Sequence, residues 1–175
     1  DLLANEFTMA GYHVTVTKLL AADYLVPQLR YRIFILGTRT RPVESPDPRA
    51  FAKECYGLES ADFDISASAA IGDLGEPVLK DQLASYLGQP HSRLSTILRQ
   101  GNGKAVSLHE MPRMSDRDKE FVKHIPPGGN YLDIPDDIST ERIMKFKASG
   151  GRTTTYGRLH PDRPSYTINT YFRRP

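Results

Sequence analysis

Two arginines and a glutamine lie directly before a short apolar run. The chain reads Gln-x-Arg-x-Arg at 28–32 and continues into the β-type run 33–36. Because strand side chains alternate between two faces, Gln28, Arg30 and Arg32 share one side if the strand already runs extended through them. A guanidinium is a rigid fork of donors that suits carboxylates, phosphates and base edges. The stretch predicts either a row of hydrogen-bonding groups at one edge of a buried strand, or a solvated strand end whose charges have no binding role.

The elements before and after this stretch determine how its side chains are held. Residues 1–10 have the pattern of a helix that ends at Gly11. The segment 12–20 is β-branched and alternating, which predicts a strand, and a short link then leads to the strand 30–36. Two neighbouring strands joined in this way predict an antiparallel pair. Three prolines in 39–49 predict a linker or irregular arm.

The remainder of the chain predicts short helices and many turns. Residues 66–74 read as a helix with Ser66 as a possible N-cap, and 78–87 as a second helix. Ser115 begins a capping signature for a helix over 115–124, which the Pro-Gly turn at 125–131 ends. The segment 92–100 has no clear pattern. A turn is expected at 101–104, where the pattern of a phosphate-binding loop fails.

Composition indicates an ordinary globular protein of one domain, or one domain and part of another. Its 175 residues are 39% hydrophobic and 25% charged, with no unbroken apolar run of membrane-spanning length. The single cysteine, Cys55, excludes an internal disulfide framework and a multi-cysteine zinc site, and we expect a buried or idle thiol. The 23 basic and 21 acidic residues nearly balance, but arginines crowd both ends of the chain. Two basic ends brought together would form one positive face.

The segment 22–36 resembles the Gln-x-Arg-x-Arg motif of the DNA (cytosine-5) methyltransferases, with Leu25 where that family usually has glycine. Residues 156–170 resemble the family's closing motif, Arg-Leu-x-x-Asp-x-Pro-Ser-x-Thr-Ile-x-Thr. Between them, 66–74 is similar to its Ala-Ile-x-Asp-Leu segment, and 125–131 to its Ile-Pro-x-Gly-Gly-Asn stretch. The resemblance is loose between about residues 41 and 113, where these enzymes differ because that region reads the DNA sequence.

The resemblance implies an α+β fold: an antiparallel hairpin from the edge of the catalytic-domain sheet, followed by a small mixed, loop-rich target-recognition domain. The expected division is 1–40 for the end of the catalytic domain and 41–175 for the recognition domain. The family's Pro-Cys, Glu-Asn-Val and Phe-x-Gly-x-Gly motifs do not occur in the sequence. We therefore expect the carboxy-terminal part of a longer enzyme, in keeping with the lack of an initiator Met. By itself it should neither bind S-adenosylmethionine nor methylate DNA, and no metal site is expected.

The resemblance also assigns roles to particular residues of the intact enzyme. Arg32 is expected to donate to O2 of a flipped cytosine and to orient the catalytic glutamate, with Arg30 supporting the pocket or a phosphate. Gln28 is expected to brace the hairpin and the recognition region. Base contacts are expected from loops in 92–104 or 150–155. The pattern of 150–155 equally favours an exposed loop without a binding role. The expected DNA-binding residues are Gln28, Arg152, Thr153, Thr154, Arg158, Thr167, Asn169 and Thr170.

The expected partner is double-stranded DNA, bound by a monomer in the cytoplasm, near the nucleoid, of a prokaryote or a phage-infected cell. Two other readings are a stand-alone DNA-binding module and a protein-interaction domain whose arginines pair with internal acids. The sequence leaves open the DNA target. It also leaves open whether the parent belongs to a restriction–modification system, a phage or a solitary methylase.

Overall fold

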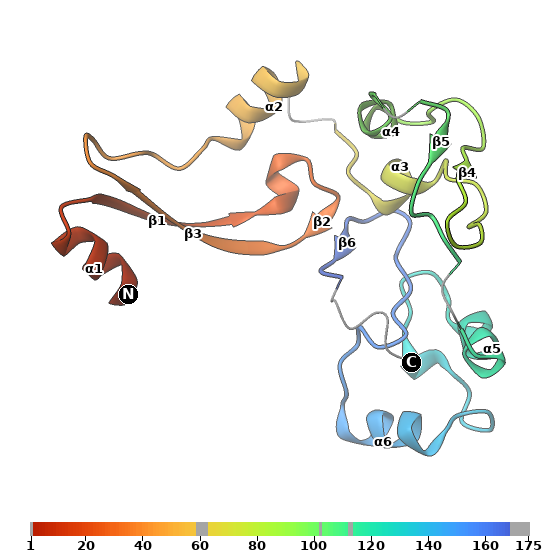
Figure 1. Ribbon diagram of the computed structural model, residues 1–175. Coiled ribbons are helices and arrows are strands. Elements are labelled where there is room, and N and C mark those ends of the chain that lie inside the picture. The colour runs from red at the N-terminus through yellow and green to blue at the C-terminus, as the bar shows by residue number, and fades with distance from the viewer. Residues whose placement is uncertain (1, 59–62, 102, 112–113, 169–175) are drawn as a thin grey trace. The chain divides into compact units, whose positions relative to one another are not determined.

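The computed structural model describes residues 2–58, 63–101, 103–111 and 114–168 (Figure 1). The chain divides into two compact units, Asp1–Ile65 and Ser66–Pro175. Within the described residues, short helices alternate with small sheets, and the strand pairs within each unit run antiparallel. The predicted mixture of helices and small antiparallel sheets is therefore confirmed at this level.

A long hairpin dominates the first unit. Strand β1, His13–Leu20, pairs antiparallel with β3, Tyr31–Thr38, in a register that runs from Leu20 opposite Tyr31 to His13 opposite Thr38. Helix α1, Leu2–Met9, precedes it, and Phe7 meets Tyr12 edge to face with ring centroids 5.9 Å apart. The β-branched alternation suits a pleated ladder, and the predicted helix and strand pair are confirmed.

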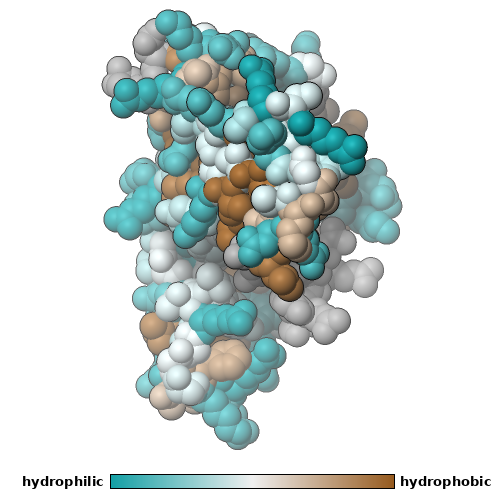
Figure 2. Space-filling model, turned by 90° about the vertical axis from the view of Figure 1, so that its left-hand side faces the viewer, coloured by the Kyte–Doolittle hydropathy of each residue, from teal (hydrophilic) through white to brown (hydrophobic). Residues whose placement is uncertain are grey.

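The hairpin is not buried within this chain, contrary to the expectation of a buried strand. Tyr31 is 56% exposed and Ile33 is 67% exposed, and Val16 on the same face is also exposed. The aromatic side chains of Phe7 and Tyr12 reach only the Ile35 end of that face. Figure 2 shows hydrophobic side chains gathered in a patch on the surface that it displays. Among the described residues, the two-stranded sheet has no second layer that would cover it.

An irregular arm follows β3, as predicted, but it ends earlier than expected. The Thr15 hydroxyl donates to the Val43 carbonyl at 2.7 Å, which fastens the arm to β1. Helix α2, Pro48–Tyr56, then begins with Asp47 as N-cap, whose carboxylate accepts from the Arg49 amide at 2.9 Å. Proline in the first turn is compatible with a helix because its missing N–H would be unpaired there. Cys55, on this helix, is an exposed thiol and not a buried one.

The second unit begins with two capped helices. Helix α3, Ala67–Ile71, has Ser66 as its N-cap, as predicted, and α4, Arg93–Leu98, begins with a capping box at Ser92. Strand β4, Ala84–Ser85, pairs antiparallel with β5, Ala105–Val106.

The predicted helix over 78–87 is wrong. The Val78 amide donates to the His109 carbonyl, and the Val78 carbonyl accepts from Met111, so these backbone groups bond to a distant segment.

The buried core of the second unit joins three elements. They are α5, Asp116–His124; the 3-10 turn η3, Tyr131–Asp133; and α6, Glu141–Ser149. Ser115 caps α5 as predicted, whereas α6 was not expected from the sequence. A last short strand, β6, covers Ser165–Tyr166. The core cluster consists of Phe121, Ile125, Tyr131, Ile134 and Ile143.

Candidate functional site

The connection between the hairpin strands has a fixed shape. The 3-10 turn η1, Ala21–Tyr24, follows β1 directly, and the Tyr24 hydroxyl donates to the Pro46 carbonyl at 2.7 Å. Leu25 then has a left-handed backbone with φ of 63°, and the Val26 amide donates back to Ala21. Glycine adopts this conformation freely and leucine does not. This explains physically why glycine is usual at the position that Leu25 occupies.

The three motif side chains do not form one uninterrupted row. Strand β2, Gln28–Leu29, and β3 are separate, and Arg30 lies between them with its carbonyl accepting from the Ala21 amide at 2.9 Å. The condition that a single strand runs through Gln28, Arg30 and Arg32 is therefore not met. Arg32 is an exposed side chain at the start of β3, opposite Leu19, and its Nη1 donates to the Tyr31 carbonyl at 2.7 Å.

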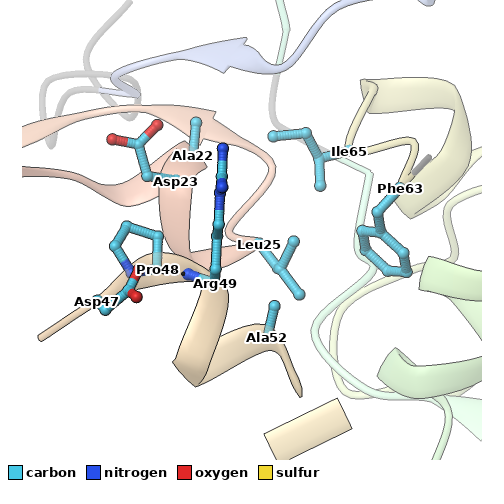
Figure 3. Close-up of a pocket in the computed structure, with 9 residues that line it drawn as sticks. All are labelled: Ala22, Asp23, Leu25, Asp47, Pro48, Arg49, Ala52, Phe63 and Ile65. Atoms are coloured by element: carbon cyan, nitrogen blue, oxygen red, sulfur yellow. Dashed lines mark hydrogen bonds between the residues drawn. The ribbon is translucent and has the colours of Figure 1, made fainter. Parts of the chain in front are cut away.

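A recess of about 430 Å³ lies in the same unit (Figure 3). Asp23, Asp47 and Arg49 supply its charged lining, and Leu25 and Phe63 are among its apolar groups. In Figure 3 the Arg49 side chain stands between Asp23 and Leu25. The lining includes neither predicted active-site arginine.

In the second unit, an anchored turn carries the predicted basic and hydroxyl groups. Helix α6 ends at Gly150 with φ of 67°, and the buried Tyr131 hydroxyl donates to the Gly151 carbonyl at 2.9 Å. The Thr155 amide donates to the Arg152 carbonyl at 3.0 Å, which closes the turn. Between these anchors, the side chains of Arg152, Thr153 and Thr154 are exposed. The turn brings together one guanidinium and two hydroxyls, groups that bind phosphates and base edges.

The closing motif has a bracing role. Arg158 Nη1 donates to the Ile125 carbonyl at 2.8 Å, and the Arg158 amide donates to Gly129. A guanidinium has five N–H donors, so this side-chain bond uses one of them. Thr167 is half-buried. Asn169 and Thr170 lie outside the described residues. Arg30 and Arg32 belong to the first unit, and Arg152–Thr154, Arg158 and Thr167 to the second.

Sequence reasoning missed a carboxylate–phenol pair. The Tyr156 hydroxyl donates to Asp118 Oδ1 at 2.6 Å, and the Ser115 hydroxyl donates to Oδ2 at 2.7 Å. These bonds, led by the one from Tyr156, lower the pKa of the Asp118 carboxyl. Burial, followed by the Asp118 hydrogen bond and charge, raises the pKa of Tyr156 to about 12. The 38-residue separation leaves no local signal.

Replacing Tyr156 by phenylalanine should change the pH dependence of stability at both ends. The Asp118 pKa is lower in the folded state, so its contribution is present above the ordinary pKa of 3.8 and is lost as pH falls through the folded value. The Tyr156 pKa is higher in the folded state, so its contribution is present below 10.0 and is lost as pH rises toward about 12. Urea unfolding between about pH 2 and 11 should show both losses in the wild type and smaller losses at both ends in the variant, in which Ser115 still donates to Asp118.

Tyr166→Phe is the matched control, because the Tyr166 hydroxyl donates to the uncharged Gly157 carbonyl at 2.8 Å. The Tyr166→Phe variant should keep the wild-type loss of folding stability at acid pH. An unchanged acid-side profile in Tyr156→Phe would contradict the assigned pairing with Asp118.

A second missed feature is a buried ion pair that joins several segments of the second unit. Arg99 Nη2 lies 2.5 Å from Asp73 Oδ2, with only 6% of the Asp73 side chain exposed. Arg99 Nη1 donates to the Gly88 carbonyl at 2.7 Å, and the guanidinium lies 3.7 Å from the centre of the Tyr86 ring. Asp73 belongs to the segment 66–74 singled out above, but Arg99 lies in the region that had no clear pattern.

The part of the chain that the structure describes contains neither a membrane-spanning helix nor a metal-binding cluster. No helix there combines the length and apolar character required to cross a membrane. No group of three or more histidine, cysteine, aspartate or glutamate side chains there is arranged to hold a metal ion.

Comparisons with known proteins agree with the motifs. Residues 1–156 match the family model "C-5 cytosine-specific DNA methylase". The chain is 42% identical over 172 residues to the type II methyltransferase M.Eco47II of Escherichia coli, covering 96% of this chain and 33% of that protein. It is 31% identical over 180 residues to M.DdeI of Desulfomicrobium norvegicum, covering 99% and 41%. M.BbvI of Brevibacillus brevis is 29% identical over 172 residues, covering 95% and 35%.

The chain thus spans between about a third and two fifths of the length of these curated relatives. The family match covers well over half of the chain and includes the hairpin with the two arginines. On these grounds, the chain belongs to the C-5 cytosine-specific DNA methylase family.

Proposed function

We propose that the chain is the DNA-binding, target-recognition part of a DNA (cytosine-5) methyltransferase. The whole enzyme would transfer a methyl group from S-adenosylmethionine to C5 of a cytosine flipped out of double-stranded DNA. The observation that carries this proposal is Arg32, an exposed guanidinium on a family-matching hairpin. An extruded base must be read by fixed donors, and a guanidinium on a strand supplies them.

The proposed division of labour places the covalent chemistry outside this chain. Arg32 would donate to O2 of the flipped cytosine and orient a catalytic glutamate, and Arg30 would support the pocket. Gln28 would brace the hairpin. The nucleophile would come from a part of the enzyme for which this chain has no matching motif. The exposed apolar face of β1 and β3 supports this arrangement, because a covering layer from a larger sheet would bury it.

The recess in Figure 3 does not fit S-adenosylmethionine. The Arg49 side chain stands in it, and its carboxylates, Asp23 and Asp47, lie on elements that do not form a glycine-rich loop. We therefore assign cofactor binding to the rest of the enzyme, and this chain contributes groups that bind the DNA and the flipped base.

The charge distribution supports a DNA-binding role for the second unit. Residues 66–175 contain 16 basic and 12 acidic residues, against 7 and 9 in residues 1–65. A positive surplus attracts the phosphate backbone. We propose a domain division into 1–40 and 41–175. The first domain ends just after β3, whose last residue is Thr38. Residues 41–65 then connect the first domain to the compact unit that begins at Ser66.

The test is methylation by the complete protein. Expression of the whole gene in a host without cytosine-5 methylation, followed by bisulfite sequencing, should show cytosines protected in one short sequence context. Unprotected genomic DNA, with soluble protein present, would contradict the enzymatic proposal. The alternatives remain a stand-alone DNA-binding module and a protein-interaction domain, which would leave the DNA unmethylated.

Arg152→Ala should weaken DNA binding about equally for target and non-target duplexes. Arg152 is exposed on an anchored turn, as a phosphate contact requires. Loss of one phosphate contact should reduce the magnitude of the log K against log salt slope by about 0.9. Fluorescence anisotropy of the complete protein at several salt concentrations measures this. Arg117→Ala, which removes an exposed arginine of α5, is the control. An unaltered salt slope for Arg152→Ala would show that Arg152 does not contact a DNA phosphate.

A further inference from the structure

Tyr131 bonds to both ends of the exposed turn over residues 151–155. Its hydroxyl donates to the Gly151 carbonyl at 2.9 Å, and its backbone amide donates to the Thr155 carbonyl at 3.3 Å. Within the turn, the Thr155 amide donates to the Arg152 carbonyl at 3.0 Å. One residue outside the turn therefore fixes the first and the last residue of a segment whose three central side chains are exposed.

The Tyr131 side chain is held in the core of the second unit. It is 1% exposed, and its ring meets the Phe146 ring edge to face with centroids 6.0 Å apart. The Gly151 amide donates to the Phe146 carbonyl at 2.9 Å, so the turn begins on the residue that packs against Tyr131. A phenylalanine ring would supply the same packing. What the hydroxyl adds is the bond that connects the buried core to the turn.

The turn presents groups that bind phosphate. Arg152 supplies a guanidinium, and Thr153 and Thr154 supply hydroxyls. Residues 150–158 contain two arginines and no acidic residue, so the local charge favours an anion. The Asp118 carboxylate, which bonds to this segment, already accepts from two hydroxyl groups. Ordering a mobile segment on binding costs conformational entropy, so a turn that is fixed beforehand presents its guanidinium at a lower cost.

We propose that Tyr131 is a positioning residue for DNA binding: its hydroxyl holds the 151–155 turn in the conformation in which Arg152 meets a phosphate. This inference rests on the proposed function, which makes Arg152 a phosphate contact, and deepens it by naming the group that fixes that contact. Tyr131 is buried and acts on the DNA only through the turn. Its hydroxyl raises the fraction of the protein in which the turn is ready to bind, and the observed affinity is proportional to that fraction.

Tyr131→Phe removes the hydroxyl and keeps the buried ring. Its effect is measured by fluorescence anisotropy of the complete protein in two backgrounds, wild type and a stripped turn that combines Arg152→Ala, Thr153→Ala and Thr154→Ala. In the wild-type background, Tyr131→Phe should weaken DNA binding roughly 2- to 12-fold, the factor that corresponds to one hydrogen bond. In the stripped background it should leave the affinity unchanged, because the side chains that the hydroxyl positions are gone. A purely structural role would weaken binding in both backgrounds.

Two further variants accompany this comparison. Gly151→Ala places a Cβ 3.2 Å from the Phe146 Cβ and 3.3 Å from the Tyr131 hydroxyl oxygen, so it should disturb the same contact with Tyr131 intact and show the same dependence on background. Tyr166→Phe is the matched control, because its hydroxyl donates to the Gly157 carbonyl, which lies beyond the turn. It should leave the affinity unchanged. Thermal unfolding verifies that each variant is folded at the temperature of the assay.

The outcomes separate this inference from the function on which it rests. A loss of affinity confined to the wild-type background supports the positioning role of Tyr131. Equal losses in the two backgrounds, or no loss in either, would overturn that role and leave the proposed function in place. A stripped turn that binds DNA as tightly as wild type would instead contradict the phosphate contact assigned to Arg152, and the positioning role would be wrong with it.

Discussion

If the complete protein has the proposed activity, replacing Arg32 by alanine is expected to slow methyl transfer roughly 10- to 150-fold while leaving DNA affinity almost unchanged. The range corresponds to the loss of one charge-assisted hydrogen bond, about 1.5–3 kcal/mol, made mainly in the transition state. Arg32 is exposed at the start of β3, and its guanidinium donates to the carbonyl of the adjacent Tyr31, so its removal leaves the strand pairing intact. Single-turnover rates and salt-dependent affinities measure the two effects separately.

Two further variants sharpen this prediction. Arg32→Lys keeps the charge but loses the planar fork, so it should fall between wild type and alanine. Arg152→Ala provides the opposite signature, with weaker binding and a smaller salt slope. If Arg32→Ala changed affinity and salt slope alone, Arg32 would be a contact to the DNA backbone, and the active-site role would be wrong.

Removing Arg99 is expected to destabilise the second unit by about 3–5 kcal/mol, the usual effect of breaking a buried ion pair. The Arg99→Ala variant leaves the Asp73 carboxylate, with 6% of its side chain exposed, without its 2.5 Å partner. It also deprives the Gly88 carbonyl of a donor and exposes one face of Tyr86. Hydrogen–deuterium exchange of the complete protein should show faster exchange in residues 66–111, since domain stabilities are only about 5–15 kcal/mol.

Arg93→Ala is the matched control, because Arg93 is an exposed arginine at the first position of α4, the helix that has Arg99 as its C-cap. The double variant Asp73→Ala/Arg99→Ala should recover part of the loss, since it removes the isolated charge along with its partner. Equal rates of amide hydrogen exchange in the Arg99 and Arg93 variants would show that the Arg99–Asp73 ion pair does not stabilise residues 66–111.

Local signals in the sequence predicted the parts of the fold that depend on nearby residues. The alternating pattern of 12–20 and the short link to Arg30 were sufficient for the β1–β3 hairpin. Ser66 and Ser115 marked two helix starts because an N-cap side chain bonds to an amide three residues on. The same signal was present at Asp47 for α2, where the prolines favoured a linker reading instead.

Features that depend on distant residues were not predictable in this way. Val78 looked helical by its neighbours, but its backbone bonds to His109 and Met111, 31 and 33 positions further along. The Tyr156–Asp118 and Arg99–Asp73 pairs likewise span 38 and 26 positions. For the candidate site, the motif resemblance selected Arg32, and the basic, hydroxyl-rich composition of 150–155 selected Arg152. The break of the strand at Arg30 is a three-dimensional property of the η1 connection.

The open hairpin has a consequence for biosynthesis. The paired residues of β1 and β3 lie only 11 to 25 positions apart in the chain. The two strands can therefore associate on the order of 1–10 μs, as hairpins do, before segments more distant in the sequence reach them. During that interval the outer edges of both strands and the apolar face around Ile33 could recruit another nascent chain. Lys18 lies on that face, 4.4 Å from the centre of the Tyr31 ring, and Arg32 lies on the other. Charged side chains beside an apolar strand oppose such pairing, so we expect the replacement of either cation to make the isolated hairpin more prone to aggregate.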